Sequence, residues 1–409
     1  MRNFSFRKYG DNLLFSLAIA VLITSLIYSF IRRDSGGDKQ PTLTDIVFTH
    51  WWYDDIERDL LRNLVAEFEN SHEGIRIILN EKSYESLRLG LFDFAGGDDE
   101  TEVPAFPGDV LALDPLWVPE LINREVIESA ELPVLSFINV LYYNIDILRD
   151  AGFTRPPNTR TEFLTFARTI AANEENRRAY ALSLGLGSFR GIHDNVYPWI
   201  WAAGARLINN GNPVVTSAPV VQSLAFLASL SNEGLIAPGS FYEDSRKKLE
   251  DFVSGRTAFM IASTRYIGLV RERLGDAAFN ITSVPILDNQ PGTPFFATLG
   301  WTLGIHSESA HREEARLFSA FLAGRASRIS GNASGAIPAS SPQDPFYSNI
   351  WEIALAGETA ADFSGIAGEP VLEQIFREEL SALFDGTSSP AQTAAAIQAR
   401  WLAVLAGES

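Results

Sequence analysis

The chain has 409 residues, 46% of them hydrophobic, which exceeds what one hydrophobic core usually serves, so we expect two or more lobes. Its 33 Lys and Arg residues against 51 Asp and Glu residues give a net charge of −18, which disfavours nucleic acid as a partner. The absence of cysteine excludes disulfides, thiolate zinc sites, iron–sulfur clusters and a lipid-modified cysteine.

An uncharged apolar segment lies near the N-terminus, at residues 13–31. At about 1.5 Å per residue, a helix of this length approaches the ~30 Å hydrocarbon core of a bilayer. Basic residues stand on both sides, and no small-residue cleavage site follows before Arg32. We therefore predict a cytoplasmic segment over residues 1–12, an uncleaved transmembrane signal anchor over 13–31 and a flexible tether over 32–44. A removed signal peptide is the alternative.

Strand and helix patterns alternate after the tether. Residues 46–52 predict a strand that runs into an aromatic loop, and Asp54 and Asp55 are expected to cap the helix that follows. Residues 75–79 and 109–113 predict two more short buried strands. This alternation predicts an α/β layer with a largely parallel sheet.

The second half of the chain continues the alternation. Residues 140–144 predict a strand, and Thr159 and Glu162 have the spacing of a capping box at a helix N-terminus. Residues 300–305 predict a strand interrupted by glycine, and Ser389, followed by proline, predicts the start of the last helix.

Sequence patterns of the common enzyme classes are missing. The five histidines show no zincin spacing, and the chain has neither a Walker A loop nor a nucleophile elbow. The adjacent acids Asp54 and Asp55, like Asp98 and Asp99, do not face each other across a sugar as glycosidase carboxylates must. We therefore predict no catalytic residue, no cofactor and no metal site.

Aromatic residues follow several predicted strands, where ligands bind in open α/β sheets. A sugar presents apolar C–H faces and a rim of hydroxyls, which flat aromatic rings and a few carboxylates or amides recognise. Each aromatic side chain has core packing as its alternative role, and Asp114 has helix capping. The residues of this group are Trp51, Trp52, Asp114, Trp117, Tyr197, Trp199 and Trp301.

Five segments in order resemble the family 1 extracellular solute-binding proteins, the group that includes the maltose-binding protein. The segment LYYNIDILRDAGFTRPPNTRTEFLTFA is the most specific of them. The others are IVFTHWWYDDIERDLLRNLVAEFE, DVLALDPLWVPELINREVI, FVSGRTAFMI and GWTLGIHSESAHREEARLFSAFL. The resemblance covers residues 45–405.

The resemblance implies a two-lobed periplasmic-binding-protein fold of the class II type with hinge crossings between the lobes. Lobe 1 would comprise residues 45–136 and 300–335, and lobe 2 residues 137–299 and 336–409. By position in the family, the ligand contacts would be Trp51, Trp52, Asp114, Trp117, Phe137, Asn139, Tyr197, Trp199, Arg265 and Trp301.

Two of these positions depart from the maltose-binding pattern. Phe137 stands where that pattern has a glutamate, and Arg265 stands where it has an aromatic residue, so maltodextrin itself is disfavoured as the ligand. Arg265 either binds a carboxylate or phosphate of the ligand or pairs with an acid of the other lobe.

The resemblance further implies the solute-binding component of an ABC importer for a sugar or oligosaccharide, and not an enzyme. It would lie in the bacterial cell envelope, anchored to the cytoplasmic membrane through residues 13–31, with the binding domain facing the periplasm or exterior. Its partners would be the carbohydrate, the permease subunits and the lipid bilayer. A membrane-tethered ligand sensor or adaptor of the same fold is the alternative, and an envelope glycoside hydrolase is a second.

Overall fold

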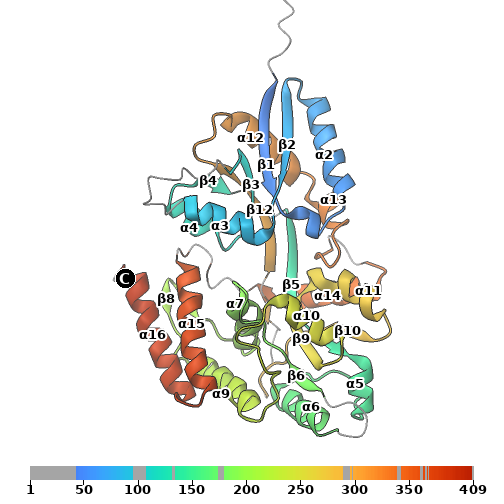
Figure 1. Ribbon diagram of the computed structural model, residues 1–409, viewed down its shortest axis with the longest axis vertical. Coiled ribbons are helices and arrows are strands. Elements are labelled where there is room, and N and C mark those ends of the chain that lie inside the picture. The colour runs from blue at the N-terminus through green and yellow to red at the C-terminus, as the bar shows by residue number, and fades with distance from the viewer. Residues whose placement is uncertain are drawn as a thin grey trace, which may run out of the picture.

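Two α/β lobes make up the chain in the computed structural model, and two long strands lie between them (Figure 1). The structure describes residues 43–94, 107–130, 134–173, 179–288, 295–296, 298–338, 342–359, 363, 366 and 368–407. The transmembrane segment predicted over residues 13–31 lies outside these ranges. None of the helices within them combines the length and apolar character that crossing a bilayer requires.

Lobe 1 is built on a mixed sheet covered by helices. Its strands are β1 (Thr44–His50), β2 (Ile75–Glu81), β3 (Val110–Leu113), β4 (Ile127–Ala130) and most of β12 (Thr298–His306). Its helices are η1 (Trp52–Asp54), α2 (Arg58–Ser71), α3 (Tyr84–Phe94), α4 (Val118–Asn123), α12 (Arg312–Ala323) and α13 (Ala326–Ser330). Helix α2 buries Leu60, Leu61, Leu64, Val65 and Phe68, the face that its apolar spacing predicts.

Lobe 2 holds the rest of the sheet and more helices. Its principal strands are β5 (Leu135–Asn144), β6 (Tyr180–Leu182), β9 (Thr257–Ser263) and β10 (Phe279–Thr282), beside the short pairs β7 (Ile208–Asn209) with β8 (Asn212–Pro213) and β11 (Phe295–Phe296) with β13 (Glu358–Thr359). Its helices are α5 (Ile145–Asp150), α6 (Arg160–Ala172), α7 (Gly191–Asn195), α8 (Tyr197–Trp201), α9 (Ala218–Asn232), α10 (Ser245–Val253), η2 (Thr264–Tyr266), α11 (Ile267–Leu274), α14 (Pro345–Ala356), α15 (Glu369–Phe384) and α16 (Pro390–Leu405).

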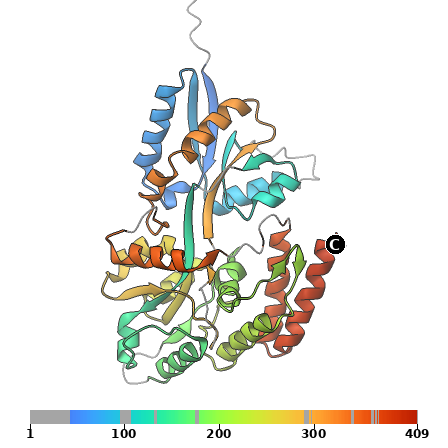
Figure 2. The same ribbon diagram turned by 180° about the vertical axis from the view of Figure 1, so that it is seen from behind.

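The two lobes share one path of paired strands, in the order β2-β1-β3-β12-β5-β9-β6. The junction is the antiparallel pairing of β12 with β5, in which Trp301 lies opposite Leu135 and Thr298 lies opposite Ile138. Figure 2 shows the same two strands between the lobes from behind. The lobe boundaries given above remain a prediction.

The three strands within residues 44–113, from which a parallel sheet was expected, do pair in parallel, but the sheet as a whole is mixed. β1 pairs in parallel with β2 and β3, and β6 with β9. β12 is antiparallel to β3, β4 and β5, and β5 is antiparallel to β9 and β10. The reason is that β12 returns to lobe 1 from far along the chain and enters the sheet against the direction of its neighbours.

Two of the helix starts predicted from the sequence are confirmed, and one is wrong. The Thr159 side chain accepts a hydrogen bond from the Glu162 backbone at 3.3 Å, and Ser389 forms a complete capping box with Gln392. The expectation that Asp54 and Asp55 cap α2 is wrong, because that helix begins at Arg58 with Glu57 as its N-cap. Residues Trp52–Asp54 instead form a 3-10 turn.

Gly335 follows α13 in a conformation that only glycine adopts easily. Its φ is +77°, and a Cβ there would collide with the backbone carbonyl of Thr264. We therefore expect Gly335→Ala to lower the free energy of unfolding by more than about 2 kcal/mol in chemical denaturation. The matched control is Gly90 inside α3, where an added Cβ would meet no heavy atom within 4 Å, so Gly90→Ala should stabilise by roughly 0.5–1 kcal/mol. Equal effects of the two substitutions would contradict this explanation.

Candidate functional site

Aromatic side chains from separate segments meet in lobe 1, where they form the lobe 1 aromatic cluster of Trp51, Trp52, Tyr84, Trp117 and Trp301. Trp52 stacks on Trp301 with ring centroids 5.1 Å apart and planes 15° from parallel. Trp51 lies 5.5 Å from Trp117 and 5.2 Å from Tyr84. The sequence predicted four of these five residues as ligand contacts, and the structure brings those four together.

The lobe 1 aromatic cluster belongs to the hydrophobic core of lobe 1 and contains several indole groups without a hydrogen-bond partner among the described residues. The Nε1 atoms of Trp51, Trp52 and Trp117 are buried and have no hydrogen-bond partner within the part of the chain that the structure describes. A buried N–H without an acceptor costs about 1–3 kcal/mol, so most such groups in proteins are satisfied. Trp199 in the core of lobe 2 also lacks an indole partner, so the grouping of three such donors in one place, and not the missing partner itself, marks this cluster.

Asp114 follows β3 directly and faces the second lobe. Its Oδ2 accepts a hydrogen bond from the Tyr84 hydroxyl at 2.9 Å and one from Arg190 Nη1 at 2.7 Å. Its Oδ1 accepts from the backbone N–H of Leu116, which fixes the turn before α4. The carboxylate therefore connects the aromatic cluster of lobe 1 to an arginine of lobe 2.

Charged side chains on and next to α7 form the lobe 2 side of this contact. Arg190 Nη2 lies 2.8 Å from His193 Nδ1, and Asp194 Oδ1 lies 3.1 Å from the same nitrogen. Asn139 of β5 donates to Asp194 Oδ1 at 3.4 Å. We call Asp114, Arg190, His193 and Asp194 the junction charge cluster.

Within the junction charge cluster, His193 is neutral and Asp194 is charged, although both are buried. Burial lowers the pKa of His193, and the nearby Arg190 charge lowers it further, so the imidazole is neutral. Burial raises the pKa of Asp194. The charge of Arg190 and the hydrogen bond from His193 outweigh this effect, so the pKa of Asp194 lies below its usual value. The sequence did not reveal Arg190, because one arginine in a glycine-rich loop carries no distinctive pattern.

Two buried glutamates of α15 lie behind α7. Glu373 Oε1 accepts from the backbone N–H groups of Ile192 and His193 at 2.8 and 3.4 Å, which holds the start of α7 in place. Burial raises the pKa of Glu373 well above its usual value, and the charge of Glu369 adds to this. Burial also raises the pKa of Glu369, to about 7, against the opposing charge of Arg190.

Arg265 pairs with an acid of the other lobe, which is one of the two roles that the sequence left open for it. From η2 of lobe 2 its Nε donates to Asp55 Oδ1 of lobe 1 at 2.9 Å. Phe137, at the start of β5, packs edge-on against Trp301 at 6.0 Å.

Tyr197 and Trp199 lie in the hydrophobic core of lobe 2, away from the lobe 1 aromatic cluster. Trp199 packs against Phe163 and Phe226, with centroids 5.1 and 4.8 Å away. Tyr197 stacks on Phe363 and touches the His193 ring edge-on at 5.9 Å. Their role as ligand contacts stays a prediction, and the structure gives both residues a packing role.

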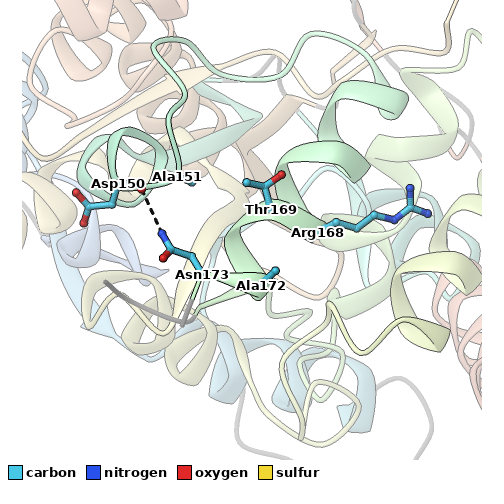
Figure 3. Close-up of a pocket in the computed structure, with 6 residues that line it drawn as sticks. All are labelled: Asp150, Ala151, Arg168, Thr169, Ala172 and Asn173. Carbon is cyan, nitrogen blue, oxygen red and sulfur yellow. Dashed lines mark hydrogen bonds between the residues drawn. The ribbon is translucent and has the colours of Figure 1, made fainter. Parts of the chain in front are cut away.

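A surface pocket of about 530 Å³ lies elsewhere, between α5 and α6 of lobe 2 (Figure 3). The Asn173 side chain donates to the backbone carbonyl of Asp150 across it, and Arg168 is paired with Glu233. Its lining contains none of the predicted ligand contacts. Over the described ranges, no group of His, Asp and Glu side chains is arranged to hold a metal ion.

A family model described as bacterial extracellular solute-binding protein matches residues 55–329, more than half of the chain. The chain belongs to the bacterial extracellular solute-binding proteins. This family is one of solute-binding proteins and not of enzymes.

Solved structures of the same fold cover most of this solute-binding protein. The GacH receptor of Streptomyces glaucescens is 16% identical and covers 89% of this chain and 99% of its own, with a TM-score of 0.69. The cyclic alpha-maltosyl-1,6-maltose binding protein of Arthrobacter globiformis is 17% identical, with a TM-score of 0.70 over 89% of this chain and 100% of its own. At these identities the likeness establishes the two-lobed periplasmic-binding-protein fold.

Curated relatives match over shorter stretches. A probable ABC transporter-binding protein of Deinococcus radiodurans is 26% identical over 198 residues, which is 47% of this chain and 47% of that protein. A putative binding protein of Brucella abortus is 23% identical over 159 residues, or 38% and 37% of the two chains. The chain thus spans less than half the length of the curated relatives it matches.

Glu369 gives the site a testable pH dependence. Because its pKa is raised to about 7 in the folded chain, the proton it holds contributes stability at acid pH that is lost as the pH rises through 7. We expect Glu369→Gln to be more stable than the wild type at pH 8, by on the order of 1–3 kcal/mol, and no more stable at pH 4. Chemical denaturation at both pH values measures this.

The matched control is Glu378→Gln on the same helix, whose side chain is 47% exposed and paired with Arg400. That substitution should bring no gain in stability at pH 8. A Glu369→Gln variant that is less stable than the wild type at pH 8 would show that the buried carboxylate is stabilised by its surroundings.

Proposed function

We propose that the chain is the extracytoplasmic solute-binding component of an ABC importer and that it binds a sugar or oligosaccharide in a cleft between its lobes. The observation that carries the proposal is the lobe 1 aromatic cluster, which holds three buried indole N–H groups without a partner among the described residues and which Tyr84 joins to Asp114 at the contact between the lobes. They lie at the ends of β1 and β3, where open α/β sheets bind ligands.

The chemistry of these groups suits a carbohydrate. Indole rings offer flat apolar faces to the C–H groups of a sugar, and their N–H groups donate to its hydroxyl oxygens. A carboxylate such as Asp114 accepts from hydroxyls and a guanidinium such as Arg190 donates to them, and hydrogen bonds to charged groups are the stronger kind. The junction therefore combines the two kinds of contact that a sugar needs.

The ligands named for related structures also support a carbohydrate as the ligand. The GacH receptor was solved in complex with acarbose, and other structures of this fold are a cyclic alpha-maltosyl-1,6-maltose binding protein and a chitin oligosaccharide binding protein. The proposed ligand contacts are Trp51, Trp52, Asp114, Trp117, Phe137, Asn139, Arg190, Arg265 and Trp301. Tyr197 and Trp199 enter the proposal as support for α7, through the contact of Tyr197 with His193.

Transport follows from closure of the lobes. A ligand that touches both lobes favours the closed form, and moving a population from 1:99 to 99:1 needs about 5.5 kcal/mol of differential binding. Aromatic contacts and several charge-assisted hydrogen bonds reach that magnitude. The permease then recognises the closed form, and residues 13–31 tether the protein to the cytoplasmic membrane.

Thermal melting of a fragment that starts at Lys39, against mono-, di- and oligosaccharides, tests the ligand class. A saccharide at 100 times its Kd should add about 2.7 kcal/mol to stability, which gives a readable rise in Tm. Trp51→Ala should weaken that ligand about tenfold or more, because it removes both a ring face and an N–H donor.

Trp199→Phe is the control for this experiment, since it changes a tryptophan in the core of lobe 2. It should lower Tm without the same loss of affinity. A rise in Tm with amino acids or polyamines and none with any saccharide would overturn the proposed ligand class.

The tether has its own test, on the full chain expressed in a bacterial host. We expect the full chain to sediment with membranes and the fragment from Lys39 to stay in the soluble fraction. A full chain recovered in the soluble fraction, shortened at its N-terminus, would show that the segment is a removed signal peptide.

A further inference from the structure

Helix α7 is five residues long, and buried ionisable side chains hold it at both ends. It lies between α15 and α10 (Figure 1). At its start, Glu373 of α15 accepts hydrogen bonds from two of its backbone N–H groups. At its end, Lys248 of α10 donates from Nζ to Asn195 Oδ1 at 2.7 Å. A helix this short is not stable by itself, so its contacts decide where it lies.

The Lys248 ammonium joins three elements of lobe 2. Besides Asn195 Oδ1, it donates to the backbone carbonyl of Ile261 in β9, also at 2.7 Å. Asn195 in turn donates from Nδ2 to the carbonyl of Gly191, at the other end of α7, at 2.8 Å. A single nitrogen atom of α10 therefore fixes α7 relative to the sheet.

A lysine in this position is costly to bury. Lys248 is 2% exposed, and both of its hydrogen-bond acceptors are neutral. Lysine is almost never fully buried unless it is paired, because burial disfavours the ammonium. Burial lowers the pKa of Lys248 to about 8, although the charge of Asp194 opposes this effect. An apolar side chain would fill the same space without burying a charge, so stability alone does not account for the lysine.

Helix α7 sets the direction of Arg190, which is its N-cap residue. The backbone N–H of Asp194 donates to the Arg190 carbonyl at 2.9 Å. The guanidinium Nη2 lies 2.8 Å from His193 Nδ1, and its Nε lies 3.5 Å from Asp194 Oδ1. A shift of α7 therefore moves the guanidinium that the proposed function places at the ligand.

We propose that Lys248 is a positioning residue for ligand binding, which holds α7 where His193 and Asp194 aim the Arg190 guanidinium at the lobe junction. The lysine acts through Asn195 and does not itself touch the ligand. Its effect on α7 is a property of lobe 2, whereas its effect on affinity rests on the proposed function.

Hydrogen exchange of the ligand-free full chain in detergent, followed by mass spectrometry, tests the effect on α7. Lys248→Met removes both donors and keeps an unbranched side chain, so the amides of α7 should exchange about tenfold faster or more, while those of α2 in lobe 1 keep the wild-type rate. Lys247→Met is the matched control, because Lys247 is adjacent in the chain but 44% exposed and paired with Asp251. It should leave the exchange of α7 unchanged.

Unchanged exchange of α7 in Lys248→Met would overturn the proposal. An acceleration spread evenly over lobe 2 would also overturn it, because that result indicates a general loss of packing. Circular dichroism shows whether the variant is folded. If it is not, Asn195→Ala decides the question in its place: faster exchange confined to α7 supports the proposal, and wild-type exchange contradicts it.

Titration calorimetry of the same variants, with the saccharide that gives the largest rise in Tm, tests the effect on affinity. Lys248→Met should bind this saccharide about fivefold or more weakly, and Lys247→Met should bind it as the wild type does. Adding Lys248→Met to Asn195→Ala should cause little further loss, because the lysine acts through that asparagine.

Additive losses in the double variant, or unchanged affinity in spite of faster exchange of α7, would rule out the positioning role. If no saccharide raises Tm, the proposed ligand class fails, and the exchange experiment still decides whether Lys248 holds α7, since it needs no ligand. The two failures are therefore distinguishable.

Discussion

The antiparallel pairing of β12 with β5 is the constraint on which the rest of the molecule depends. β12 reaches lobe 1 from nearly 200 residues downstream of β3, and its pairing with β3 and with β5 places both lobes on one strand path. The same register puts Trp301 opposite Leu135 and beside Trp52, so the aromatic cluster exists only when the two crossings are correctly paired. Sheet topology and candidate site are therefore set by one set of backbone hydrogen bonds.

The free-energy cost of burying charged side chains is the second constraint, and it differs between two groups of buried residues. Asp114, Arg190 and Asp194 offset one another, whereas burial of Glu369 and Glu373 outweighs the opposing charge of Arg190 and raises the pKa values of both glutamates. Glu373 nevertheless holds the backbone of α7, which carries His193 and Asp194. A second layer of buried acids thus orients the residues that face lobe 1.

Local patterns predicted local structure well and long-range contacts poorly. The caps at Thr159 and Ser389 depend on neighbours three residues away, which the sequence displays. The antiparallel entry of β12 and the partner of Arg265 depend on residues more than 180 positions apart, which no periodicity encodes. Trp51 and Trp199 illustrate the same limit. Both are buried tryptophans near a strand end or helix start, and only the fold places Trp51 in the core of lobe 1 and Trp199 in the core of lobe 2.

The Asp114–Arg190 contact also bears on how selectivity would arise under the proposed function. When a ligand must replace the Asp114–Arg190 contact, it gains only the difference between its own bonds and the bond it breaks. A hydroxyl carries one O–H donor and two acceptor lone pairs, so a sugar with adjacent hydroxyls can donate to Asp114 from one of them and accept from Arg190 at the other. Under the proposed function, this contact therefore favours ligands that offer a hydrogen-bond donor and an acceptor together, because only such ligands replace both bonds.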